Sequence, residues 1–385
     1  MSGTPGTNLT ATVAASLRGR TATISSTSDS SPAGFTANTT YTTPGSAIAP
    51  GGTVVATSGG TNNYNPSSTR LGQTGVINGD YTIASSTDPA IPITGGGSFE
   101  AYGPAAGLQY TAFGVWDLAP CANTASCTPA YAGTYGGAKL GVVLTSTMPT
   151  TGGATYTGGA VGYVVQPVAV NPTNVAQFYG TSSLTANFGT GGITGSITGI
   201  NAYSVGNNSS GQTLLGTINN IGLTATISGS SYAGTTTVTG GAGTAFNIAG
   251  ATGTVTGGFY GPAANETAGV FDLSGGANNT TLVGSFGAKQ AAPSDRRLKQ
   301  EIVPLGTLPN GLKLYSWRYL GGNRRFTGVM AQDLLADSRF AGAVDADARG
   351  LMQVDYAGIG FIPADFDEML AEGKQALAVY RRTYH

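Results

Sequence analysis

Residues 294–299 read Ser-Asp-Arg-Arg-Leu-Lys and lie where the composition of the chain changes abruptly. The residues before this hexapeptide are rich in Gly, Thr, Ser, Ala and Asn and carry few charges, whereas those after it form an ordinary charged sequence of mixed character. A junction between two such different segments predicts two modules. The serine and the lysine five residues apart at the junction also fit a processing site between the modules.

Charge is distributed unevenly along the 385 residues, of which only 9% are charged, against about 25% in a typical globular chain. Seven of the 18 acidic and five of the 17 basic residues lie before residue 291. Neither part is basic enough to attract a phosphate backbone, so we expect no nucleic-acid partner. No run of 18 apolar residues is present, so we expect no transmembrane segment.

The first residues of the chain, Met-Ser-Gly-Thr-Pro, lack the charged and apolar regions of a signal peptide. Two interpretations follow. Either the chain reaches the outside by another route, such as virion assembly, or its true N-terminus is missing.

The two cysteines, Cys121 and Cys127, enclose five small or polar residues. A zinc site would need four ligands, and the single histidine is His385 at the end of the chain. We therefore expect no metal and no cofactor. A disulfide between Cys121 and Cys127 would close a short loop and stabilise the fold by about 2 kcal/mol. Two free thiols are the alternative.

Residues 1–96 alternate short β-prone runs with Gly, Pro and Asn. Residues 11–17 and 21–24 are typical of strands, and the Ser-rich residues 25–31 are typical of a loop. Low charge and many threonines fit strands on an extracellular scaffold, but they also fit a partly disordered stalk. This region is therefore expected to be either a β-structure or a stalk.

Residues 97–290 carry the stronger strand signal, because residues 110–116 and 159–165 alternate bulky and small side chains. Residues 181–188 and 193–197 have period-2 patterning and flank a Gly-Thr-Gly-Gly turn, which predicts a hairpin. Strands at short spacing without helices predict a sandwich or a barrel. Many glycines inside the strands favour strong curvature, hence a barrel.

We therefore expect a mainly β chain, with a Gly/Thr-rich β-barrel or β-sandwich region followed by a small α+β domain that ends in a helix. The expected barrel domain is 97–290, and the expected C-terminal domain is 291–385. A further strand pair, formed by residues 223–227 and 245–248, is expected inside the barrel domain.

Two stretches of the barrel region resemble a known family. Residues 257–266 read Gly-Gly-Phe-Tyr-Gly-Pro-Ala-Ala-Asn-Glu and lead to Gly-Ser-Phe-Gly-Ala-Lys at 284–289. These stretches resemble the final hairpin of transferrin-binding-protein-B-like β-barrels, and the strands of Tyr163 and of residues 113–116 fit the same pattern. The resemblance implies an eight-stranded surface barrel that binds host proteins or solutes such as haem. The chain departs from that family in lacking a lipoprotein signal and a lipidated cysteine.

Residues 294–360 carry several motifs in a fixed order. The opening Ser-Asp-Arg-Arg-Leu-Lys-Gln-Glu-Ile is followed by an aromatic strand at 314–319, a strand entering a helix at 326–335, and Val-Asp-Tyr at 354–356. This order resembles the S74 peptidase family, the intramolecular chaperone of phage tail spikes and endosialidases.

The S74 resemblance implies a domain that trimerises, helps the upstream β-structure to fold and in many members cuts the chain before the serine. Carried over by position, the catalytic pair is Ser294 and Lys299, and the cleavage site is the bond between Pro293 and Ser294. The helical tail of the family, which often helps trimer formation, corresponds to residues 364–382.

The proposed chemistry is reasonable for these residue types. A serine hydroxyl needs a base, and a neutral lysine can serve when no histidine is near. The pKa of a free lysine is about 10.4, so its amine must be desolvated or crowded by cations to work as a base at neutral pH. Arg296 and Arg297 provide such a positive field, and Asp295 opposes it. Because positions i and i+5 do not face each other on a helix or a strand, a turn must bring the pair together. Alternatively, Ser294 and Asp295 simply cap a turn beside a solvated basic face formed by the two arginines and the lysine.

Residues 364–382 predict an amphipathic helix, with Asp365 as N-cap and Glu368 completing a capping-box-like pair. The apolar face of this helix has two possible partners. It can pack on its own domain, or it can form a three-stranded contact with other copies of the chain. The side chains of the apolar stripe are Phe366, Met369, Leu370, Leu377 and Tyr380.

Three classes of function compete. The first, favoured because its motifs are more specific, is a surface-displayed or virion structural or binding protein whose C-terminal domain trimerises and cleaves itself. The second is a transferrin-binding-protein-like barrel that binds a host protein, a glycan or a small solute and has no protease activity. The third is a carbohydrate-active enzyme, which needs two positioned carboxylates such as Glu100 with Asp117. The first two classes place the chain on a virion or a cell surface.

Overall fold

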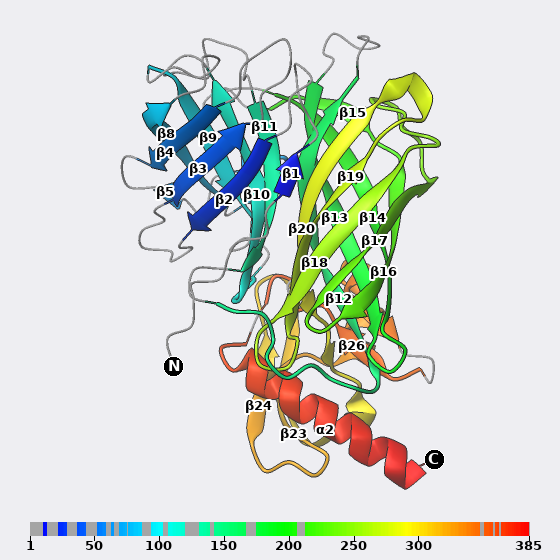
Figure 1. The fold of residues 1–385 in the computed structure, drawn as a ribbon. Helices are drawn as coiled ribbons and strands as arrows, with labels where there is room; N and C mark the ends of the chain where they lie inside the picture. Colours follow the sequence, from blue (N-terminus) through cyan, green and yellow to red (C-terminus); the bar gives the residue numbers. More distant parts are fainter. Residues whose placement is uncertain are drawn as a thin grey trace. The chain divides into compact units, whose positions relative to one another are not determined.

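The computed structural model in Figure 1 describes residues 11–13, 22–28, 37–43, 52–58, 63–64, 69–74, 76–86, 94–102, 107–119, 131–138, 142–166, 175–205, 212–346, 350–356, 359–361 and 363–384. Strands dominate this part of the chain, which confirms the mainly β fold class. The chain divides into two compact units, Met1–Ala288 and Lys289–His385.

The first unit begins with an antiparallel sheet of order β1-β2-β3-β4-β8-β9-β10-β11, in which β5 also pairs with β8. A separate two-stranded ladder joins β6 to β7. Cys121 and Cys127 lie outside the described residues, so their disulfide stays a prediction. The strands of this part are β1 (Ala11–Val13), β2 (Ala22–Ser28), β3 (Ala37–Thr43), β4 (Gly52–Ser58), β5 (Asn63–Tyr64), β6 (Thr69–Arg70), β7 (Gln73–Thr74), β8 (Ile77–Ser86), β9 (Gly96–Ala101), β10 (Thr111–Ala119) and β11 (Tyr131–Ala138).

The second sheet of the first unit closes on itself, which selects the barrel over the sandwich (Figure 1). Its order is β13-β12-β20-β19-β18-β17-β16-β14, and β13 pairs back with β14, so eight strands of the described chain form a ring. Strand β15 (Leu214–Thr217) pairs with β14 outside this ring, and the short helix η2 (Ala277–Asn279) precedes β20. The ring strands are β12 (Gly153–Val165), β13 (Val175–Asn187), β14 (Gly192–Ser204), β16 (Asn220–Ser228), β17 (Ser231–Gly240), β18 (Thr252–Tyr260), β19 (Glu266–Leu273) and β20 (Thr281–Gln290).

The structure confirms one of the two strand pairs expected in the barrel and corrects the other. Strands β13 and β14 form the expected hairpin, in which Asn187 pairs with Gly192. The partner of β16 is β17 and not residues 245–248, because Gly229, at φ 60°, allows a tight turn directly after β16. Residues 245–248 form only an isolated bridge to Ile218 and contribute buried side chains to the core instead.

The interior of the barrel is filled by side chains rather than open. Aromatic rings on one strand lie over glycines on a neighbouring strand. At Gly284, for example, an added Cβ would lie 2.2 Å from Cζ of Phe271, and at Gly257 it would lie 2.4 Å from Cζ of Tyr232. These glycines therefore provide the space that the rings occupy, which accounts for many glycines in strands that are also rich in aromatics.

The second unit contains two small antiparallel sheets, of order β21-β26-β25 and β22-β23-β24. The aromatic strand expected at 314–319 is present as β23, and the strand entering a helix is present as β24 followed by α1, so both expectations are confirmed. The elements are β21 (Ala292–Pro293), η3 (Arg296–Leu298), β22 (Lys299–Thr307), β23 (Lys313–Tyr319), β24 (Arg325–Gly328), α1 (Ala331–Leu335), η4 (Ala341–Ala343), β25 (Val344–Ala346), β26 (Met352–Val354) and α2 (Phe366–Tyr384).

The C-terminal helix α2, red in Figure 1, begins two residues after the expected start. Phe366, Met369 and Leu370 are buried in the core of the second unit, and Leu377 and Tyr380 pack against that core. The expected apolar stripe therefore packs on its own domain. At the start of α2 the carbonyl oxygen of Asp365 accepts the N–H of Met369. Among the described residues, no helix is long and apolar enough to cross a membrane.

Candidate functional site

Ser294 directly follows β21 and is fully buried. Its N–H donates to the carbonyl oxygen of Met352 at 3.0 Å, and its own carbonyl oxygen accepts the N–H of Ala331 at 3.0 Å. The Ser294 hydroxyl lies 3.1 Å from the hydroxyl of Tyr356. Strand β26 and the start of α1 thus fix the backbone of Ser294, while Tyr356 fixes its side chain.

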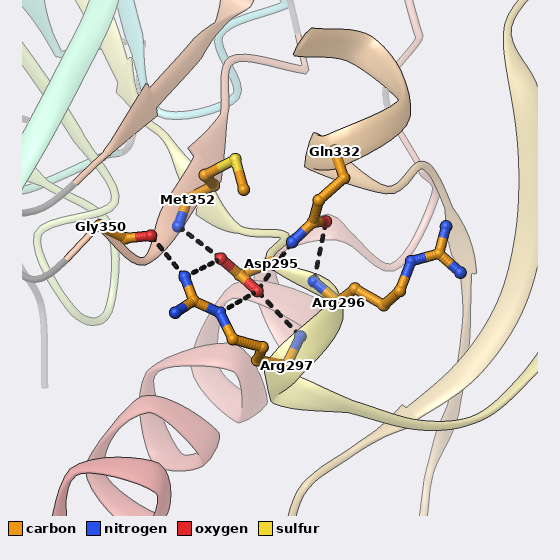
Figure 2. Close-up of polar contacts among 6 residues, drawn as sticks. All are labelled: Asp295, Arg296, Arg297, Gln332, Gly350 and Met352. Atoms are coloured by element: carbon orange, nitrogen blue, oxygen red, sulfur yellow. Dashed lines mark hydrogen bonds and ion pairs between the residues drawn. The ribbon is translucent and has the colours of Figure 1, made fainter. Parts of the chain in front are cut away.

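The carboxylate of Asp295 gathers hydrogen bonds from three separate segments, as Figure 2 shows. Oδ1 accepts the N–H of Arg297 at 2.8 Å, its Nε–H at 3.0 Å and the amide of Gln332 at 2.9 Å. Oδ2 accepts Nη2 of Arg297 at 2.7 Å and the N–H of Met352 at 3.1 Å. Burial alone would raise the pKa of Asp295, but the hydrogen bonds from Arg297, Met352 and Gln332 outweigh it and hold the pKa below its usual value.

The structure supports part of the alternative in which residues 294–299 serve only as a turn cap and a solvated basic face. Asp295 does cap a turn, because its side chain accepts the Arg297 N–H at the start of η3. The side chains of Arg296 and Arg297 are 45% and 44% exposed, as a solvated basic face requires. Lys299, in contrast, is buried and does not belong to such a face.

The amine of Lys299 is buried, with a carbonyl oxygen and an aromatic ring as its neighbours. Its Nζ donates to the carbonyl oxygen of Val329 at 2.7 Å and lies 3.7 Å from the ring centre of Trp317. Burial lowers the pKa of Lys299 well below its usual value, and Arg296 lowers it further, whereas Asp295 and Asp333 raise it. Arg296 thus contributes the expected positive field, but desolvation is the larger cause of the lowered pKa of Lys299.

The side chains of Ser294 and Lys299 are linked only indirectly, through Val329. In the described chain their side chains share no hydrogen bond. Val329 connects them, since its N–H donates to the Tyr356 hydroxyl at 3.4 Å and its carbonyl oxygen accepts Lys299. The helix η3 lies between Ser294 and Lys299, at which β22 begins, but this turn does not join the two side chains by a hydrogen bond.

The carbonyl group of Pro293, the residue before Ser294, also has a side-chain partner. The hydroxyl of Tyr319 donates to its oxygen. Tyr319 is fully buried, and burial, followed by the nearby Tyr356 and Glu372, raises its pKa well above the usual value, so it remains a neutral donor. The motifs at 314–319 and 354–356 contain Tyr319 and Tyr356, but no local pattern assigns either tyrosine a role.

The carboxylates that a glycosidase would need are present but buried. Glu100 pairs with Val115, and Asp117 pairs with Ser98, so the two acids are diagonal neighbours on one face of β9 and β10. Glu100 is 5% and Asp117 8% exposed, and the Tyr102 hydroxyl donates to Glu100 at 2.8 Å. Glycoside hydrolysis requires both carboxylates to reach a sugar and a water, so this pair is poorly placed for it.

Two segments of the chain match known protein families. Residues 148–290 match the model of the C-lobe and N-lobe β-barrels of transferrin-binding protein B. Residues 294–344 match the peptidase S74 model, described as the chaperone of endosialidase. Both resemblances are therefore confirmed for these segments. The comparison with curated proteins gave no match.

Solved structures of a surface lipoprotein and of transferrin-binding protein B match this chain at low identity and low TM-score. A surface lipoprotein has 19% identity and a TM-score of 0.32, with 48% of this chain and 77% of that chain covered. A double mutant of transferrin-binding protein B from Haemophilus parasuis has 15% identity and a TM-score of 0.36, covering 70% and 65%. The isotype 1 protein from Neisseria meningitidis has 14% identity and a TM-score of 0.32, covering 70% and 66%. The chain thus spans about two thirds of the length of these two transferrin-binding proteins.

Proposed function

We propose that residues 291–385 form a folding and assembly module that trimerises and cuts the chain between Pro293 and Ser294. The upstream β-structure is then the displayed part of a virion or cell-surface protein. The observation that carries the cleavage is a buried lysine, Lys299, linked through Val329 and Tyr356 to a buried serine that directly follows a polarised peptide carbonyl. The S74 match at 294–344 supports the same function.

The cleavage needs no group from outside except water. The Ser294 hydroxyl oxygen attacks the carbonyl carbon of Pro293, and neutral Lys299 accepts the hydroxyl proton. The bond between that carbon and the nitrogen of Ser294 then breaks, the nitrogen leaves as an amine with the proton from Lys299, and an ester remains. Water hydrolyses the ester. Since Lys299 donates to Val329 in the structure, it must exchange this partner for Ser294 before the first step.

The proposed trimer contact lies on β22 rather than on α2. The apolar face of α2 is already used inside its own unit. Strand β22 is at the edge of its sheet and carries two large exposed hydrophobic side chains, Val303 at 46% and Leu305 at 55%. An exposed edge with apolar side chains favours association with another chain, and a second copy is the partner that a trimerising module supplies.

A second candidate function is capture of a host protein by the barrel, without proteolysis. The match of residues 148–290 to transferrin-binding protein B barrels favours it. A small solute inside the barrel is disfavoured, because packed side chains such as Tyr156, Phe178 and Phe259 fill the interior. This candidate predicts an intact monomeric chain.

The full-length chain tests the proposal directly. After purification it is incubated under native conditions, then denatured and analysed by mass spectrometry, while light scattering gives its oligomeric state. We expect fragments that end at Pro293 and begin at Ser294, a trimer in solution, and an intact Ser294→Ala variant. A wild-type chain that stays intact over days contradicts the cleavage, and a monomer contradicts the assembly.

A further inference from the structure

The carbonyl of the scissile bond is held in a closely packed setting. Tyr319, whose hydroxyl donates to the Pro293 oxygen, has ring centres of Trp317 and Phe326 at 6.1 Å and 5.8 Å. Helix α2 approaches from another side, because a Cβ at Gly373 would lie 3.1 Å from the Tyr319 hydroxyl and 3.3 Å from Cδ of Pro293. The donor and its acceptor are thus fixed before any reaction begins.

The hydroxyl of the nucleophile is fixed in the same way. The Tyr356 hydroxyl lies 3.1 Å from Ser294 Oγ and accepts the Val329 N–H. Its ring packs against Phe361 and Phe366, with centres 6.3 Å and 5.7 Å away. Burial raises the pKa of Tyr356 to about 12, so this hydroxyl also stays neutral and can both donate and accept.

Negative charge develops on the Pro293 oxygen when Ser294 attacks, because the carbonyl carbon becomes tetrahedral. A hydrogen-bond donor aimed at that oxygen in a buried site stabilises the charge with little reorganisation. Among the described residues, the Tyr319 hydroxyl is the donor on this oxygen.

We propose that Tyr319 is a catalytic residue of the self-cleavage, donating its hydroxyl proton in a hydrogen bond to the oxyanion formed at Pro293, and that Tyr356 is a positioning residue that holds the Ser294 hydroxyl. This inference rests on the proposed function. It gives the two hydroxyls separate tasks: Tyr319 acts on the electrophile and Tyr356 on the nucleophile. Neither tyrosine gains or loses a proton overall, so the balance of the reaction is unchanged.

The rate of cleavage in single-hydroxyl variants tests the inference. Tyr319→Phe is expected to slow fragment formation by about 10²–10³-fold, the usual effect of losing one oxyanion donor. Tyr356→Phe is expected to slow it less and to be partly rescued by Tyr356→His, which restores a polar partner for Ser294. Tyr315→Phe is the matched control, because it removes a hydroxyl from the same strand that bonds to Asp333 rather than to the scissile bond.

Two further measurements separate catalysis from folding. Each variant is also made with Ser294→Ala, and its thermal midpoint is compared with that of Ser294→Ala alone. If Tyr319→Phe lowers the midpoint strongly, 3-fluorotyrosine is placed at 319 instead. This nearly isosteric residue is a stronger donor, so we expect faster cleavage than in wild type, an effect that a packing role would not produce.

Different results would refute the roles of the two tyrosines and the proposed function. If wild type never cleaves, the proposed function fails. If wild type cleaves and folded Tyr319→Phe cleaves within about threefold of it, or if fluorotyrosine leaves the rate unchanged, the role of Tyr319 is refuted. Cleavage of folded Tyr356→Phe at the wild-type rate refutes the role of Tyr356.

Discussion

Replacing Asp295 by alanine tests the reasoning about the buried carboxylate most directly. The change leaves the backbone N–H of Met352 and the side-chain amide of Gln332 without this acceptor in a partly buried site, and each loss costs about 1–3 kcal/mol. It also removes the acceptor of the Arg297 guanidinium, but that side chain is 44% exposed and its contribution is small because water screens it. We therefore expect a loss of about 3–5 kcal/mol in the free energy of unfolding of the second unit.

The assay is denaturant unfolding of the full chain in the Ser294→Ala background, which removes cleavage as a complication. Trp317 lies in the core of the second unit, and its fluorescence reports that transition once Trp116→Phe has removed the other tryptophan. Asp337→Ala is the matched control. Asp337 makes the same three hydrogen bonds to Arg339, at 2.7–3.0 Å, but in an exposed position, so we expect little change.

The effect of Asp295 must also depend on pH. Its pKa is lowered in the folded chain, so its stabilisation is present above the unfolded pKa of about 3.9 and is lost as pH falls through the lower folded value. The difference in stability between wild type and Asp295→Ala should therefore shrink below about pH 4. A loss under about 1 kcal/mol at pH 7, or a difference that grows on acidification, would refute the account.

Three other changes have clear expected results. Glu266→Ala removes the acceptor of the N–H groups of Gln109, Tyr110 and Thr111, at 2.7–3.0 Å, and should lower the free energy of unfolding of the first unit by about 3–5 kcal/mol in thermal or denaturant unfolding. In Gly284→Ala the added methyl group would clash with the packed aromatic ring beside it, so the change should cost about 1–3 kcal/mol in the same assay. Gly192→Ala is the control, and it should cost far less because its methyl group would make only an ordinary contact. Lys299→Met should abolish fragment formation by mass spectrometry while the chain remains folded by circular dichroism.

Much of the second unit could be predicted from the sequence because its motifs are local. The order of strand, turn and helix from Ser294 to residue 335 follows from short patterns, and the helix expected at 364–382 is observed at Phe366–Tyr384. The burial of the α2 stripe in its own core could not be predicted, since an apolar face does not specify its partner.

The contacts that define the site join residues far apart in the sequence. Tyr356 lies 62 residues from Ser294, and Tyr319 lies 26 residues from Pro293, so no local pattern could pair them. The β16 partner was mispredicted for a related reason. Residues 245–248 have strand-like composition, but Gly229 turns the chain into β17 first, and the apolar side chains of 245–248 then fill the core.

The position of β21 has a consequence for the products. Residues 289–293 remain with the upstream fragment after a cut at Pro293, yet they belong to the C-terminal unit. Ala292 and Pro293 are strand partners of Val354 and Gln353, and Nζ of Lys289 lies 4.1 Å from the ring centre of Phe366. Hydrolysis of the bond would therefore turn a covalent linker into a bound peptide ligand with a new carboxylate. The two products would then separate at the rate at which this peptide dissociates, so a native gel would show one species long after a denaturing gel shows two.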